Sequence, residues 1–283
     1  MSVFRPLPAA GLAVGAVLVA TVPASASILS LEGDTAARLM DEVVSPNGDV
    51  LLAALQDEEA APPADESDWK GKFRAGFAGS FGNTDTQSAF ASAEGIREKD
   101  DQRTTLSAGY YYGASNGDRD DNKLESLARH EWLMPESPWS IFAELQFDYD
   151  EFQSWEYRLG AYAGFGYELM REEDFELDGR VGAGAIKEFN SPNDDVRGEL
   201  LLALVARWQI SEKQSLNAST TWYPSLSDGG EFRTVNRADW SVVLDEEMNL
   251  SLAAGVRHEY QSEREPGVKA DDVKITVGLQ FDF

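Results

Sequence analysis

The chain has 283 residues, with 24 Gly, 7 Trp, 9 Tyr and 14 Phe, and its lack of Cys excludes disulfides, thiol catalysis and Cys-ligated zinc. A formal net charge of -26 argues against nucleic-acid binding, which relies on clustered lysine and arginine. Mean hydropathy is -0.37, and after the N-terminus no stretch reaches the roughly 20 apolar residues that a membrane helix needs.

The first 26 residues predict an export signal. Arg5 supplies a positive charge, and residues 7–22 are mostly apolar. Ala24-Ser25-Ala26 then fits the rule for small residues at a cleavage site. We therefore expect a signal peptide over residues 1–26. A membrane-anchoring helix is the alternative, but the apolar run is short and small residues follow it.

Residues 27–68 predict an acidic N-terminal extension or linker. Within it, residues 57–68 are acidic and contain prolines but no large apolar residue, which is typical of a linker. Residues 34–44 have the apolar spacing of a short helix. A periplasmic extension is the simpler interpretation, and a plug folded into a barrel lumen is the alternative.

From residue 69 onward, apolar and polar residues alternate in twelve segments. Alternate side chains of a strand point to opposite faces, so each segment predicts a strand with one apolar and one polar face. The last segment shows this pattern, with an apolar row from Val273 to Phe283. We expect strands over about residues 72–81, 87–97, 105–112, 123–133, 139–150, 155–168, 175–185, 200–210, 216–222, 238–244, 250–260 and 272–283.

Aromatic residues mark the ends of several apolar rows. Such ends are typical of the two interfacial girdles of a transmembrane barrel, whereas a soluble sandwich core has no reason to prefer that order. The predicted lipid-interface aromatics are Trp139, Tyr149, Trp155, Tyr167, Phe281 and Phe283.

The predicted connections alternate in length, as they do in outer-membrane barrels. They are short after the even-numbered segments and mostly longer after the odd-numbered ones, with residues 114–122 as one of the longer connections. The predicted fold is all-β. Residues 69–283 are expected to form a transmembrane antiparallel up-and-down β-barrel of about twelve strands, preceded by the short periplasmic extension.

Two groups of motifs resemble a known family. The first is Trp69-Lys-Gly71 with Gly82-Asn83-Thr84, and the second runs from Phe147-Asp-Tyr-Asp-Glu-Phe152 to Tyr157-Arg-Leu-Gly160. They resemble the YdiY-like family, whose members are labelled salt-induced outer-membrane proteins and which is also described as domain of unknown function 481. The resemblance covers about residues 69–283 and implies an outer-membrane barrel, but leaves the biochemistry open.

The polar rows carry charges of both signs, and the candidate lumen residues are Glu144, Asp148, Arg158 and Arg180. In a barrel of twelve strands such charges either pair and fill the bore or line a narrow aqueous channel. This size lies between filled barrels and porins, so both interpretations stay open.

No catalytic residue, cofactor site or metal site is predicted. A barrel hydrolase needs a histidine to activate a serine, but His130 and His258 fall on apolar rows. Gly113 stands where an outer-membrane phospholipase would carry the histidine before Ser115. Residues 116–122 offer oxygen ligands for a hard cation, but their spacing does not match a calcium loop, which favours a solvated acidic loop.

Two functions remain for such a barrel. One is a narrow, porin-like channel or an envelope protein of the osmotic response, and the other is a non-conducting structural or interaction barrel. In both cases we expect it in the outer membrane of a Gram-negative bacterium. The expected partners are outer-membrane lipids, lipopolysaccharide, and the barrel-assembly machinery acting on the strand that ends at Phe283.

Overall fold

The computed structural model of the protein describes residues 68–80, 85–192, 194–263 and 269–283. The predicted signal peptide and, except for Asp68, the predicted acidic extension lie outside the described residues. Among the described residues, no helix is long and apolar enough to cross a membrane. The regular structure of this part is strand: β1 (Trp69–Ser80), β2 (Thr86–Lys99), β3 (Gln102–Ser115), β4 (Asp118–Leu133), β5 (Trp139–Asp150), β6 (Tyr157–Arg171), β7 (Phe175–Phe189), β8 (Val196–Ser211), β9 (Gln214–Pro224), β10 (Phe232–Asp245), β11 (Leu250–Gln261) and β12 (Asp271–Asp282).

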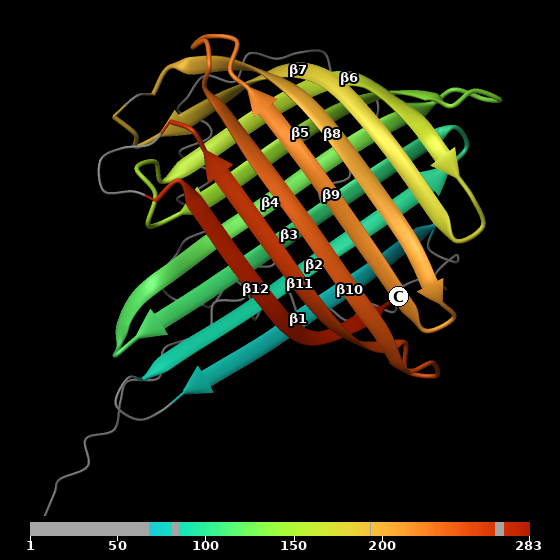
Figure 1. The fold of residues 1–283 in the computed structure, drawn as a ribbon, viewed down its shortest axis with the longest axis horizontal. Coiled ribbons are helices and arrows are strands. Elements are labelled where there is room, and N and C mark those ends of the chain that lie inside the picture. Colours follow the sequence, from blue (N-terminus) through green and yellow to red (C-terminus); the bar gives the residue numbers. More distant parts are fainter. Residues whose placement is uncertain (1–67, 81–84, 193, 264–268) are drawn as a thin grey trace, which may run out of the picture. The chain divides into compact units, whose positions relative to one another are not determined.

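The strands follow one another around a closed barrel in the order of the sequence (Figure 1). Consecutive strands are antiparallel, and β12 closes the barrel by pairing with β1. The predicted fold class, an antiparallel up-and-down barrel of about twelve strands, is confirmed. We call the end that carries Trp69 and Phe283 the base, and the opposite end, where β1 and β11 finish, the mouth.

Strand alternation places apolar side chains outside the barrel and charged ones inside it. In β5, Ile141 and Leu145 are exposed, whereas Glu144 and Asp148 are buried. A water-soluble protein has the opposite arrangement, because exposing a wide apolar surface to water is unfavourable. Apolar residues outside and polar residues inside are the pattern of a membrane-spanning barrel.

The connection between β3 and β4 is a tight hairpin, and the predicted longer connection over residues 114–122 is wrong. The strands continue to Ser115 and Asp118, which leaves only Asn116 and Gly117 in the turn. Both turn residues have positive φ, 51° and 89°. Asn-Gly accepts these angles readily, and a two-residue hairpin of this kind matches the twist of its strands. The acidic residues after Gly117 therefore belong to a strand.

Trp155, predicted as a lipid-interface aromatic, is instead buried at 2% exposure. It lies before β6, in the connection that follows β5 at the mouth, and its ring is 4.3 Å from the guanidinium carbon of Arg158. The sequence alternation continues back to Trp155, but strand pairing with β5 begins only at Tyr157. Trp155 therefore does not share the outward orientation of the β6 row.

The other predicted interface aromatics differ in exposure. Trp139, Tyr167, Phe281 and Phe283 are exposed, and the rings of Trp139 and Tyr167 meet edge to face across β5 and β6 at 4.7 Å. Tyr149 is half-buried beside Tyr157. The contact of these five residues with lipid stays a prediction.

Candidate functional site

A cluster of charged side chains crosses the barrel interior near the mouth. This mouth cluster consists of Lys123 and Glu125 on β4, Arg158 on β6, and Arg257 and Glu259 on β11. Their side chains are between 2% and 11% exposed. A charge that is removed from water is costly unless it is paired, so these residues need one another.

Lys123 has more carboxylates around it than one ion pair requires. Its Nζ atom lies 3.1 Å from Glu125, 3.5 Å from Glu259, 3.6 Å from Asp272 and 3.7 Å from Asp150. These partners belong to β4, β5, β11 and β12, so one buried ammonium group links two pairs of neighbouring strands that are distant from each other in sequence.

Two arginines complete the mouth cluster. Arg257 lies 2.6 Å from both Glu125 and Glu259. Arg158 donates hydrogen bonds to Asp148 at 2.9 Å and to Glu259 at 3.2 Å. The bond from β6 to β11 joins strands that are well separated around the barrel, so the mouth cluster spans the interior.

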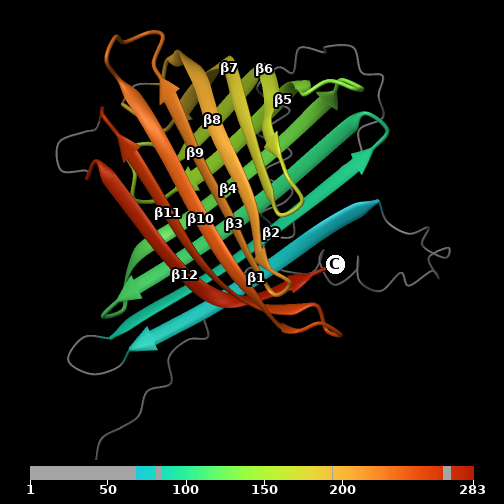
Figure 2. The same ribbon diagram turned by 45° about the vertical axis from the view of Figure 1, so that its right-hand side comes forward.

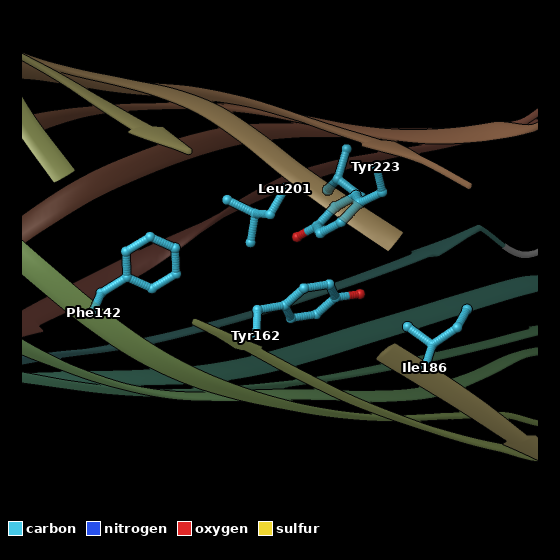
Figure 3. Packing of buried hydrophobic residues seen from close by; sticks show 6 residues of the cluster. Phe142, Tyr162, Ile186, Leu201 and Tyr223 are labelled. Atoms are coloured by element: carbon cyan, nitrogen blue, oxygen red, sulfur yellow. The ribbon is translucent and has the colours of Figure 1, made fainter. Parts of the chain in front are cut away.

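Beside the mouth cluster, part of the interior is apolar. Buried side chains of β5 to β10 gather there and occupy the space enclosed by the strands (Figure 3). Tyr162 and Tyr223 have ring centroids 5.4 Å apart, and their hydroxyl groups bond to Glu199 at 2.6 Å and Gln146 at 2.8 Å. The members of this interior apolar cluster are Phe142, Tyr162, Ile186, Leu201, Tyr223 and Val235.

Towards the base the interior is also charged, but several of its side chains are more exposed. Arg180 lies 3.0 Å from Glu131, and both are buried. By contrast, Arg207 on β8, which contacts Glu176 at 2.8 Å, is 35% exposed. Water therefore reaches the interior below the mouth cluster. Arg237 on β10 is 44% exposed but lies level with the mouth cluster, because it is paired with Arg257 in the strand register and contacts Glu125 at 3.0 Å.

The structure separates the four predicted lumen residues into two places. Arg158 and Asp148 bond to each other at the mouth cluster. Glu144 and Arg180 lie closer to the base, where Glu144 pairs with Arg129 on the neighbouring strand. All four are buried in the interior, and their role in lining a channel stays a prediction.

Sequence reasoning did not select Lys123, and did not anticipate the interior apolar cluster. Lys123 belongs to the same alternating row of β4 as Glu125, and this spacing could have identified it as an interior residue. Phe142 and Tyr162 alternate with the apolar residues of their strands and so share the polar, inward rows, where their large size was the available signal. Large rings at inward positions of neighbouring strands indicate a bore that is partly filled by side chains.

A cavity of about 260 Å³ lies at the mouth, beside the mouth cluster. Its lining includes Trp155, Arg158, Arg233 and Glu231. Burial raises the pKa of Glu231, and the neighbouring Glu263 carboxyl raises it further. The buried Nε atom of Arg233 has no hydrogen-bond partner among the described residues. A buried donor of this kind can be satisfied by water or by a bound solute.

The histidines do not resemble a hydrolase centre. His130 bonds to Thr104 at 2.9 Å, and His258 bonds to Asp271 at 2.9 Å. Both lie on the outward rows of their strands. Among the described residues, no group of three His, Asp or Glu side chains is placed to hold a metal ion. Asp121, from the segment with oxygen ligands, pairs with Lys274.

These observations define the class and the family of the protein. Charged residues inside and apolar residues outside a closed barrel define a membrane-spanning β-barrel. Within that class, the chain belongs to the family described as "Protein of unknown function, DUF481", whose profile matches residues 73–283. The predicted domain of unknown function is thus confirmed, whereas the YdiY-like, salt-induced label stays a prediction.

Similar solved structures include two porins and an outer membrane channel. The NanC porin shows 11% identity and a TM-score of 0.47, with 75% of this chain and 98% of that chain covered. The KdgM porin, solved in complex with disordered oligogalacturonate, shows 11% identity and a TM-score of 0.41, covering 76% and 99%. An outer membrane channel from Pseudomonas putida F1 shows 12% identity and a TM-score of 0.44, covering 81% and 98%. No curated protein matches the sequence. At these identities and TM-scores, the likenesses carry no functional conclusion.

Proposed function

We propose that the protein is a porin-like barrel of the outer membrane of a Gram-negative bacterium, and that it passes small ions and solutes through a narrow bore. The observation that carries the proposal is the contrast between Arg207, 35% exposed near the base, and Lys123, 2% exposed at the mouth, on inward rows of the same barrel. The bore is wet below the mouth cluster, so the mouth cluster is its constriction.

The mouth cluster is suited to open without leaving a charge unpaired. Lys123 has four carboxylates within 3.7 Å and can shift between them while keeping a partner. Moving it therefore costs less than breaking a single buried ion pair, which leaves an uncompensated charge. Charged side chains around a narrow pore also select ions by their sign.

Single-channel recording in a planar bilayer tests the proposal. We expect discrete openings from the purified barrel. Arg237→Gln removes an exposed positive charge from the bore, so the reversal potential in a salt gradient should shift towards cation selectivity. Lys213→Gln is the matched control, because Lys213 is 61% exposed in a turn at the base. A correctly inserted barrel that never opens would refute conduction.

A non-conducting structural or interaction barrel is the second candidate. It is favoured by the interior apolar cluster, in which Phe142 has no exposed surface and Leu201 is 2% exposed. If these side chains and the mouth cluster together obstruct the whole cross-section, the barrel stays silent in the bilayer. Inserted protein without openings would therefore support this candidate.

We further propose that the protein has no catalytic activity, because neither outward-facing histidine can serve a nucleophile inside the barrel. Hydrolysis of a phospholipid or a p-nitrophenyl ester that disappears in a His130→Ala or His258→Ala variant would contradict this.

The link to osmotic stress rests on the family resemblance alone. If this link holds, the amount of the protein in the cell envelope should rise when the growth medium contains more salt, and an unchanged amount would contradict it.

The proposed location and partners can be tested together in cells. The protein should fractionate with outer-membrane lipids and lipopolysaccharide, and its N-terminus should be Ser27 after signal cleavage. If the barrel-assembly machinery recognises the final strand, Phe283→Ala should slow assembly more than the equally outward-facing Ile275→Ala. Recovery of the protein from the soluble fraction would contradict the location.

A further inference from the structure

The seam between β1 and β12 is closed only in its base half. The two strands pair from Lys72 with Asp282 to Ala75 with Leu279, and backbone bonds between Gly71 and Phe283 extend the seam at the base. On their other sides, both strands are paired along nearly their whole length. The short seam is therefore a property of this one junction.

The two strands separate towards the mouth, as Figures 1 and 2 both show. The separation begins at two glycines, Gly76 and Gly278, which follow the last paired residues. A Cβ atom on either glycine would overlap the backbone of the opposite strand and the ring of Phe90. The backbones are thus still in close contact there, and diverge beyond this point.

A cavity of about 570 Å³ lies where the strands diverge. Its lining includes outward-facing Phe77 and Ile275, exposed by 71% and 73%, and also inward-facing Tyr111 and Thr276. A cavity lined by both faces of the same strand, such as Ile275 and Thr276 of β12, passes through the wall of the barrel. Its volume lies within the range of sites for small ligands, about 300–1,000 Å³.

Unpaired strand edges in a bilayer are costly, because hydrocarbon offers no hydrogen-bond partner to the backbone. An opening of this kind is therefore tolerated where it leads to a polar interior or where a molecule with polar groups occupies it. The outer part of the cavity is apolar, with Phe77, Ile275 and Val277. The occupant must accordingly be apolar at the membrane side and polar at the inner side.

The inner part of the cavity is acidic. Asp120, Asp121, Asp150 and Asp272 line it, and Lys274 is the one basic side chain among its lining residues. Lys274 is already paired with Asp121 and lies 5.4 Å from the ring of Tyr111. Lys274 is thus not available for an anionic group. Asp150 and Asp272 share Lys123 with two further carboxylates, and Asp120 accepts a hydrogen bond from Ser115. The carboxylates therefore outnumber the cations beside the cavity, and this excess of negative charge favours a cation.

We propose that this cavity is a lateral binding site for an amphiphile with a hydrocarbon chain and a cationic head group. The chain enters from the membrane between β1 and β12 and contacts Phe77, Ile275 and Val277. The head group lies beside the carboxylates of the inner part. This site depends on the membrane location of the barrel but not on conduction through its bore.

Fluorescence quenching by lipids with brominated acyl chains tests whether chains enter the seam. The chain has no cysteine, so single variants can be labelled with a small fluorophore. Thr276→Cys places the label on the inner side of the cavity. Ile275→Cys places it at the outer, membrane-facing side of the cavity, and Ser219→Cys places it on the inward row of β9. We expect quenching of the labels at 275 and 276, with the label at 219 unaffected.

Each result of this experiment has a separate meaning. If the label at 276 behaves like the label at 219, chains do not enter and the lateral site is refuted. If the label at 275 is not quenched, the outer face of β12 does not contact lipid and the proposed membrane location is refuted. This outcome distinguishes a failure of the membrane location from a failure of the lateral site. Heat-dependent gel mobility confirms that every labelled variant is folded.

Disulfide trapping tests the seam without a bulky label. Continuing the seam in register would place Gly79 opposite Ile275. The double variant Gly79→Cys with Ile275→Cys should not form a disulfide, because the strands have separated. The control, Phe73→Cys with Phe281→Cys, lies on the paired half and should cross-link. Equal cross-linking of both pairs would show a fully closed wall and overturn the proposal.

The head group is tested by competition. Decyltrimethylammonium should relieve quenching of the label at 276, and decyl sulfate at the same concentration should not. Asp150→Asn should weaken the effect of the ammonium compound. Equal relief by both compounds, or stronger relief by the sulfate, would refute the cationic head group.

Discussion

Replacement of Glu259 by glutamine probes the mouth cluster most directly. The Glu259 carboxylate is 3% exposed and faces three cations, Arg257 at 2.6 Å, Arg158 at 3.2 Å and Lys123 at 3.5 Å. Glutamine has nearly the same volume, so the change removes a charge without opening a cavity. The three cations then repel one another with less compensation, in an interior where water screens them poorly.

The expected destabilisation follows from this burial. Removing one partner of a buried ion pair costs about 3–5 kcal/mol, because the remaining charge is left uncompensated. Glu246→Gln is the matched control, since Glu246 contacts Lys213 at 3.2 Å with both side chains more than half exposed. An exposed pair contributes only about 0.2–1 kcal/mol. Glu259→Gln should therefore lose several times more stability than its control.

Urea unfolding of the barrel in lipid vesicles, followed by tryptophan fluorescence, measures this difference. With a urea dependence of about 1–3 kcal/mol per molar, Glu259→Gln should lower the midpoint by more than about 1 M. The midpoint of the control variant should remain within a few tenths of a molar of the wild-type midpoint. Equal midpoints for the two variants would refute the conclusion that the mouth cluster depends on charge pairing at Glu259.

Three further outcomes are expected. Gly164→Ala should impair barrel assembly, because the added Cβ atom would overlap the Val181 carbonyl oxygen on β7. The control Gly229→Ala should assemble normally, since its Cβ atom meets no other atom within 4 Å, and heat-dependent gel mobility measures the folded fraction of both variants. Among variants that keep a single tryptophan, brominated lipids should quench Trp139, 47% exposed, but not Trp155, 2% exposed, and quenching of Trp155 would place it outside the barrel. Hydrogen bonds from Lys99 and Arg97 hold the pKa of the Asp68 carboxyl below its usual value. The carboxylate therefore contributes to stability at a pH above its unfolded-state pKa, and this contribution is lost as the pH falls through its folded-state pKa. Asp68→Asn should therefore lower stability at neutral pH and leave it unchanged in strong acid, and a deficit that persists in acid would contradict this role.

The positions of the functional candidates depend on different kinds of information. The β5 alternation alone assigned Glu144 and Asp148 to the interior, because neighbouring residues of a strand must face opposite sides. The same reasoning failed for Trp155, since alternation does not reveal where strand pairing begins. The Asn116-Gly117 turn was readable from local chemistry, because few other pairs accept positive φ so easily, yet the acidic residues after it favoured a loop.

The sequence by itself determined the strand count and the inward and outward faces, since both follow from a local period of two residues. The alternating lengths of the connections indicated an antiparallel barrel. Only the tertiary structure decided which charges meet, as when Arg158 reaches Glu259 across 101 positions of sequence. It also decided that the mouth cluster crosses the interior and that the pairing of β1 and β12 stops at Ala75. These features depend on how the barrel curves and closes, which brings together side chains from strands that share no local pattern.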